Sequence, residues 1–89
     1  MEKLFVRMKE EKLDTYVLVR AWFSEYKVVT KKIMSCICDE NLYEDLSHLR
    51  ERRIYLYNKL FGFLFGLFAT GYISNELREE YVQELIDIY

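Results

Sequence analysis

The residues that normally mark turns are almost absent from this 89-residue chain. It has no proline, and its three glycines all lie within positions 62–71. The first sixty residues therefore lack the two strongest turn signals. A chain built from short strands would need such signals repeatedly, whereas long helices do not. The sequence predicts an all-α fold.

Hydrophobic periodicity predicts two long helices, over residues 15–38 and 42–69, that form a helical hairpin. In each range apolar residues recur at spacings of three and four, which place them on one face of a helix. Asp14 or Thr15 is the expected N-cap of the first helix, and the polar segment 39–41 is expected to separate the two. The stripes comprise Tyr16, Val19, Phe23, Tyr26, Thr30, Ile33 and Ile37 in the first helix, and Leu42, Leu46, Leu49, Arg53, Leu56, Leu60, Phe63 and Leu67 in the second.

A shorter third helix is predicted over residues 75–88. Gly71 suits the left-handed position that ends the preceding helix, and Ser74 suits the N-cap of the next one. The N-terminal segment 1–13 is compatible with a helix or with a strand. We favour a helix, because the sequence Lys-Glu-Glu-Lys at 9–12 would make a poor hairpin turn. The chain 1–89 is thus expected to form a single helical domain.

Residues 60–73, LFGFLFGLFATGYI, contain no charge and permit three interpretations: a membrane span, a buried core helix, or a seam between two copies. A span needs about 20 apolar residues, and extending the run to that length would include Lys59. A helix that is apolar all round needs neighbours on every side, which so short a chain does not supply. We therefore expect a homo-oligomer and regard the membrane as the alternative. The predicted interface comprises Arg53, Leu56, Tyr57, Leu60, Gly62, Phe63, Gly66 and Leu67.

Arg53 stands in the apolar stripe of the second helix at a position where leucine would be expected. A buried arginine needs an acidic partner and often selects the register or the partner of a helical seam. The other interpretation is that its stem lies along the seam while its charged head reaches water.

The predicted third helix is acidic, with five carboxylates and a single arginine. The turn before it superficially suggests a helix-turn-helix DNA reader, but DNA would repel this helix. An alternative is that the acidic side chains imitate a phosphate backbone and bind a nucleic-acid-binding protein of the host, as a mobile-element inhibitor would. The candidate acidic face comprises Glu76, Glu79, Glu80 and Glu84.

A basic cluster at residues 48–53 contains three arginines, but they radiate around the predicted helix rather than forming a stripe. Such a pattern is typical of a solvated face that pairs with nearby acids, so nucleic-acid binding is not expected.

Cysteine and histidine offer little chemistry. Cys36 and Cys38 point apart on a helix, and with His48 they would supply three metal ligands where a structural zinc site needs four. No nucleophile, general base or cofactor motif accompanies them. The few cysteines and the charged start, without the apolar run of a signal peptide, favour the cytoplasm. We expect a non-catalytic regulatory or inhibitory protein that binds another protein and associates with itself, without metal or cofactor.

Overall fold

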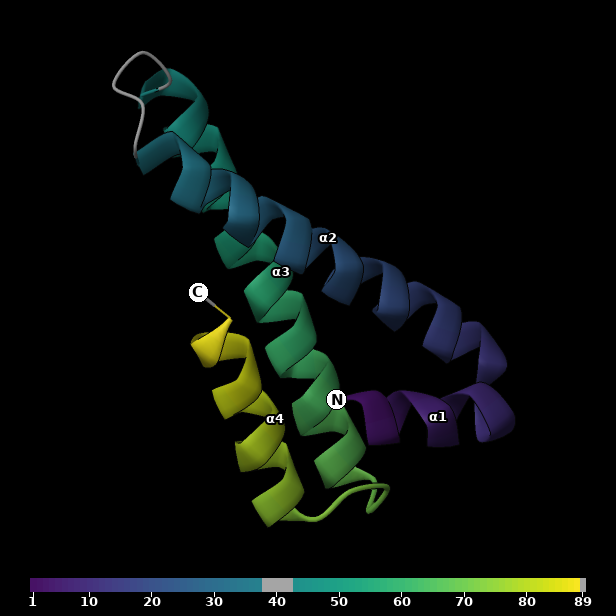
Figure 1. Cartoon of the computed structure of the whole chain (residues 1–89). Helices are drawn as coiled ribbons and strands as arrows, with labels where there is room; N and C mark the ends of the chain where they lie inside the picture. The colour runs from purple at the N-terminus through teal and green to yellow at the C-terminus, as the bar shows by residue number, and fades with distance from the viewer. Residues whose placement is uncertain (38–42, 89) are drawn as a thin grey trace.

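The computed structural model describes residues 1–37 and 43–88, and the secondary structure within these ranges is α-helical. The helices are α1 (Glu2–Glu11), α2 (Leu13–Ile37), α3 (Tyr43–Ala69) and α4 (Asn75–Asp87), as Figure 1 shows. The prediction of an all-α fold is confirmed. The segment expected to separate the long helices, with Cys38 and Leu42, lies outside the described residues.

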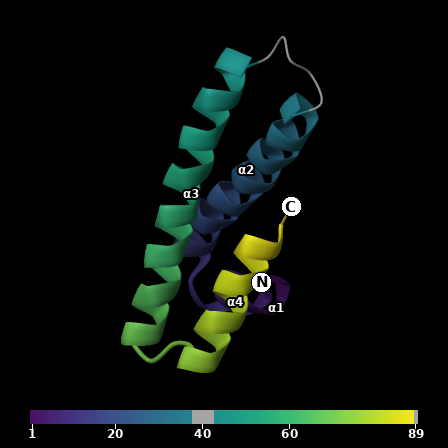
Figure 2. The ribbon, with the colours of Figure 1, turned by 90° about the vertical axis from the view of Figure 1, so that its left-hand side faces the viewer.

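Helices α2 and α3 form the predicted hairpin and diverge toward the end of the molecule where α1 lies (Figure 1). Helix α4 turns back along α3, and the two remain side by side when the molecule is rotated (Figure 2). Helix α1 packs against α2 at the open end of the hairpin, and the amine of Met1 forms an ion pair with Glu84 of α4. The arrangement is a hairpin with one short helix packed on each arm.

The favoured helix at the N-terminus is observed, and it is joined to α2 through a single residue, Lys12. The Lys12 amide donates a hydrogen bond to the Met8 carbonyl at the end of α1. The Lys12 carbonyl accepts a hydrogen bond from the Tyr16 amide in the first turn of α2. The prediction of Asp14 or Thr15 as the N-cap of α2 is wrong, because the helix already begins at Leu13.

The core joins all four helices. Leu4, Phe5 and Met8 of α1 are buried. The Phe5 ring packs edge-on against the rings of Tyr16 and Phe23, with ring centres 6.0 Å and 5.4 Å apart. Burial of these aromatic rings explains why α1 folds back on α2 at a junction that has neither proline nor glycine. The rest of the core is supplied mainly by Val19, Tyr26, Thr30, Ile33, Leu46, Leu56, Leu60, Leu64, Leu67, Ile73 and Leu85.

The turn between α3 and α4 has the predicted chemistry. Gly71 has a φ of 81°, a left-handed conformation that side chains disfavour. The Tyr72 amide donates to the Leu67 carbonyl at 2.8 Å, which satisfies one of the last carbonyls of α3. Ser74 is the N-cap of α4, and its hydroxyl accepts from the Leu77 amide at 3.1 Å.

The molecule is elongated, with principal extents of 46 × 24 × 17 Å. Its accessible surface of 6136 Å² exceeds the about 5,600 Å² expected for a folded monomer of its mass. In the described part of the chain, no helix combines the length and hydropathy needed to cross a bilayer.

Candidate protein-binding surface

The predicted interface residues of α3 lie on different sides of the helix. Leu56, Leu60 and Leu67 face inward and belong to the core of their own chain. Tyr57 and Phe63 are half-buried beside that core. Gly62 and Gly66 are exposed, and a methyl group added at either would meet no atom within 4 Å. The glycines and the leucines therefore do not share one surface.

Arg53 is half-buried at the junction of α2, α3 and α4. Its Nε donates to the Thr30 hydroxyl at 3.1 Å, and its Nη2 donates to the Tyr26 hydroxyl at 2.9 Å. The Tyr26 hydroxyl donates in turn to the Leu85 carbonyl at 2.7 Å. Two buried hydroxyl groups, those of Thr30 and Tyr26, are therefore among the partners of Arg53. The sequence had indicated an acidic partner or a guanidinium that reaches water, and it gave no sign of these hydroxyl partners. They link three helices of one chain through polar atoms.

A second row of α3 lies on the exposed side of the helix. Arg50, Ile54, Phe61 and Phe65 are separated by four, seven and four residues, spacings that return to one side of an α-helix. All four side chains are exposed; Ile54 is 59% exposed, Phe61 39% and Phe65 51%. We call this row, together with Asn58 and Gly62 between its members, the outer face of α3. Phe61, Gly62 and Phe65 of this face belong to the uncharged stretch 60–73, and the helices of the chain leave them exposed.

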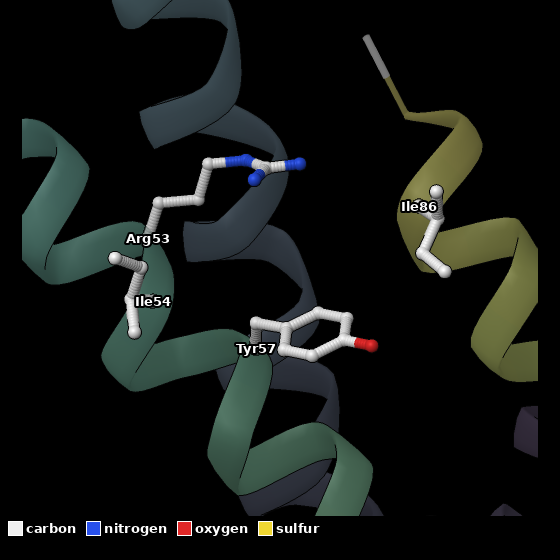
Figure 3. Close-up of a pocket in the computed structure, with 4 residues that line it drawn as sticks. All are labelled: Arg53, Ile54, Tyr57 and Ile86. Atoms are coloured by element: carbon white, nitrogen blue, oxygen red, sulfur yellow. The ribbon is translucent and has the colours of Figure 1, made fainter.

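A shallow pocket adjoins the outer face where α4 ends beside α3. Its volume is ≈ 230 Å³, and Arg53, Ile54, Tyr57 and Ile86 line it. In Figure 3 the Tyr57 ring extends from α3 toward α4, and Ile86 lies across from it. Ile86 is itself exposed, so apolar surface continues from the outer face of α3 onto α4. A side chain from another molecule would find an apolar depression here.

The acidic side chains of α4 are exposed at all four predicted positions. Glu84 pairs with the Met1 amine, and Glu79 lies 3.8 Å from Arg78. The Arg78 guanidinium is held by Asn75 and lies over the Phe68 ring, 5.6 Å from its centre. The cation is thus drawn toward α3, which leaves the outward surface of α4 acidic.

The basic cluster does not form one positive surface. Arg52 donates two hydrogen bonds to the Glu25 carboxylate, at 2.9 Å and 2.8 Å. These bonds lower the pKa of Glu25 and raise the pKa of Arg52, because each charged group stabilises the other. Arg53 points inward, so Arg50 is the arginine of this cluster left on the outer face. His48 is exposed on the same helix.

A polar contact holds the C-terminal end of α1 against the turn before α4. Arg7 donates to the Tyr72 carbonyl at 2.7 Å, and its guanidinium lies 3.8 Å from the centre of the Tyr72 ring. The Tyr72 hydroxyl donates to Glu11 at 2.7 Å, and this bond is the main reason that the pKa of Glu11 is lowered. Burial and the same bond raise the pKa of Tyr72. No local feature of the sequence signals this contact, since Arg7 and Tyr72 are 65 residues apart.

Among the residues that the structure describes, no group of three or more histidine, cysteine, aspartate or glutamate side chains could hold a metal ion. The thiol of Cys36 is free and partly exposed. The described side chains therefore offer an apolar surface and an acidic one as the candidates for function.

Comparison with known proteins adds no relative to this description: no protein-family model, curated protein or solved structure matches the chain.

Proposed function

We propose that this chain is a non-catalytic, cytoplasmic regulatory or inhibitory protein that acts by binding protein through the outer face of α3. The observation that carries the proposal is the exposure of Ile54, Phe61 and Phe65 in one row of a helix whose opposite side is packed in the core. Large aromatic side chains are enriched at the centres of protein interfaces because they bury much area at a small entropic cost.

Other features of the surface favour α3 over α2. Helix α2 also exposes apolar side chains, among them Val17, Leu18 and Val28, but these are aliphatic, whereas the outer face of α3 carries two phenylalanines. The outer face of α3 also joins the pocket beside Ile86, so a partner would meet a ridge and an adjoining depression.

Site-specific photo-crosslinking in the native cell tests this proposal. A benzophenone amino acid replaces Phe65 in one variant and Val28 in a matched control, since both positions are 51% exposed. We expect a discrete protein adduct, identified by mass spectrometry, at position 65 but not at position 28. Introducing Phe61→Ser into the position-65 variant should remove that adduct. Equal labelling at both positions, or no adduct at position 65, would overturn the proposal.

A second candidate function rests on the acidic surface of α4. Glu76, Glu79 and Glu80 are exposed on α4, whose one basic residue, Arg78, lies over the Phe68 ring and 3.8 Å from Glu79. This surface suits an inhibitor of a nucleic-acid-binding protein, and the binding would weaken as salt increases. Charge reversal of the three glutamates should abolish such binding while Phe65→Ser leaves it unchanged. The opposite pattern would assign the binding to α3.

A further inference from the structure

We infer that α1 exchanges between two copies of this chain, so that α1 and α2 become one continuous helix and the α1 of each copy packs on the α2 of the other. The inference goes beyond the proposed function, because none of the residues that carry it belongs to the outer face of α3. It names a second interaction surface, the one that α1 covers within the single chain, together with the occupant of that surface.

The apolar contacts of α1 define this occupant. Leu4, Phe5 and Met8 are buried, and the Phe5 ring packs edge-on against the rings of Tyr16 and Phe23 in α2. An α1 supplied by a second copy makes the same contacts, because the two chains are identical. Such an exchange covers the same surface on both copies and closes after two chains.

Polar contacts fix the direction in which α1 lies on the surface. At one end of α1, Arg20 of α2 donates to Glu2 at 2.7 Å. At the other end, Arg7 donates to the Tyr72 carbonyl at 2.7 Å, and the Tyr72 hydroxyl donates to Glu11 at 2.7 Å. These bonds place an exchanged α1 in one register and one orientation.

The hinge between α1 and α2 is a single residue, and its hydrogen bonds already have helical spacing. Lys12 has a φ of −144° and a ψ of 60°, whereas an α-helix has values of about −63° and −42°. Its amide bonds to Met8 and its carbonyl to Tyr16, each four residues away as in an α-helix. Rotation at Lys12 therefore straightens α1 and α2 into one helix, and so short a hinge favours exchange.

The straight helix would satisfy backbone groups that the bend leaves unpaired. Within the described part of the chain, no backbone hydrogen bond joins the amides of Leu13, Asp14 and Thr15 to the end of α1. A continuous helix places the carbonyls of residues 9–11 one turn before these amides. Residues 9–15 contain neither proline nor glycine, so the sequence permits the helix to continue.

The apolar stripe of α1 is in phase with that of α2. Residues three or four apart share one face of a helix. In the continuous helix this face comprises Phe5, Met8, Lys12, Tyr16, Val19 and Phe23. Such a helix can cross its copy near the two Lys12 residues, with each α1 half facing the α2 half of the other chain. A helix that only folds back does not require this phase, so the spacing favours exchange.

Complementary charge variants test the inference on the full chain. Glu2→Arg places two cations together within one chain, and Arg20→Glu places two carboxylates together. An exchanged heterodimer of the two variants instead pairs opposite charges at both contacts. Co-refolding the variants from urea should give this heterodimer, favoured about 3- to 30-fold over either homodimer in sedimentation velocity.

Lys12→Gly and Lys12→Ala, each made in the otherwise unsubstituted chain, provide a matched comparison at the hinge. Glycine disfavours the interior of a helix relative to alanine, and each exchanged dimer contains two such positions. The Lys12→Gly dimer should therefore be about 5- to 30-fold weaker than the Lys12→Ala dimer. Phe65→Ser, on the outer face of α3, should leave the exchanged dimer unchanged.

Spin labels at positions 3 and 21 of one variant report the shape of that chain within the heterodimer, once Cys36 and Cys38 are replaced by serine. A continuous helix separates the two labelled backbone positions by about 27 Å. In the folded-back chain the neighbouring Glu2 and Arg20 are hydrogen-bonded, so the labels lie much closer together. Pulsed electron paramagnetic resonance should give the longer distance in the heterodimer.

Several outcomes would overturn the inference. They are a mixture that stays monomeric, a dimer whose labels keep the short distance, and equally tight dimers of the two Lys12 variants. A dimer that Phe65→Ser abolishes would also overturn it and would assign self-association to the outer face of α3. The crosslink at position 65 is measured independently, so the proposed function can stand when this inference fails.

Discussion

Arg53 donates a hydrogen bond to the Tyr26 hydroxyl at 2.9 Å and thereby joins α3 to α2 beside the apolar core. Tyr26 is completely buried, and its hydroxyl also donates to the Leu85 carbonyl of α4. One hydroxyl oxygen therefore connects three helices. A buried polar group of this kind destabilises the fold when its partner is removed, since water cannot replace the lost bond.

Tyr26→Phe should lower the free energy of unfolding by about 1–3 kcal/mol, because it removes an acceptor for Arg53 and a donor for Leu85. Urea denaturation followed by circular dichroism measures the change. Tyr55→Phe is the control, since the Tyr55 side chain is 47% exposed on the same hairpin. Equal stability of the Tyr26 variant and the unsubstituted chain would show that the hydroxyl does not stabilise the junction.

Leu60→Ala and Phe65→Ala should separate the inner side of α3 from its outer face. Leu60 is fully buried, so its truncation should cost about 2–5 kcal/mol of unfolding free energy through the cavity it leaves. Phe65→Ala should change the stability of the dilute monomer by less than about 1 kcal/mol, because the ring is half exposed. Denaturation at low protein concentration compares the two. A larger loss for Phe65→Ala would mean that its ring is packed within the monomer.

Gly62→Ala and Gly71→Ala should have opposite effects on monomer stability. Gly62 lies within the exposed part of α3 with open space around it, so alanine should stabilise the helix by about 0.5–1 kcal/mol. Gly71 has a left-handed backbone, so alanine there should destabilise the turn by about 1–2 kcal/mol. Thermal unfolding of the dilute protein gives both signs. A gain in stability from Gly71→Ala would contradict the assigned conformation of the turn.

Acid should weaken the contact between α2 and α3 through Glu25. The hydrogen bonds from Arg52 lower the pKa of Glu25 below its ordinary value of 4.5. The ionised Glu25 carboxylate therefore stabilises the fold at pH values above its ordinary pKa. This stabilisation is lost as the pH falls through the lowered pKa of the folded state. Glu25→Gln should therefore be less stable than the unsubstituted chain at about pH 7 and equally stable at about pH 2. A stability difference that does not change with pH would mean that ionisation of Glu25 is irrelevant.

Local features of the sequence were sufficient to predict most of the secondary structure. The spacing of apolar residues indicated the two long helices, and Gly71 and Ser74 indicated the turn before α4 because capping depends on a few adjacent residues. The N-cap of α2 was predicted wrongly. The packing of Phe5 on Tyr16 and Phe23 folds α1 against α2, and α2 consequently begins earlier than its capping residues suggested.

The sequence by itself determined that the chain is helical, where its apolar faces lie, and that α4 is acidic. Tertiary structure decided which apolar residues of α3 are covered by the same chain. Leu56 and Leu60 are packed inside, whereas Phe61 and Phe65 remain exposed, because α2 and α4 occupy only part of the circumference of α3. The tertiary structure also decided the partners of Arg53, since Tyr26, Thr30 and Leu85 approach one another only when three helices pack. Periodicity reports which side chains share a face, but burial depends on what packs against that face.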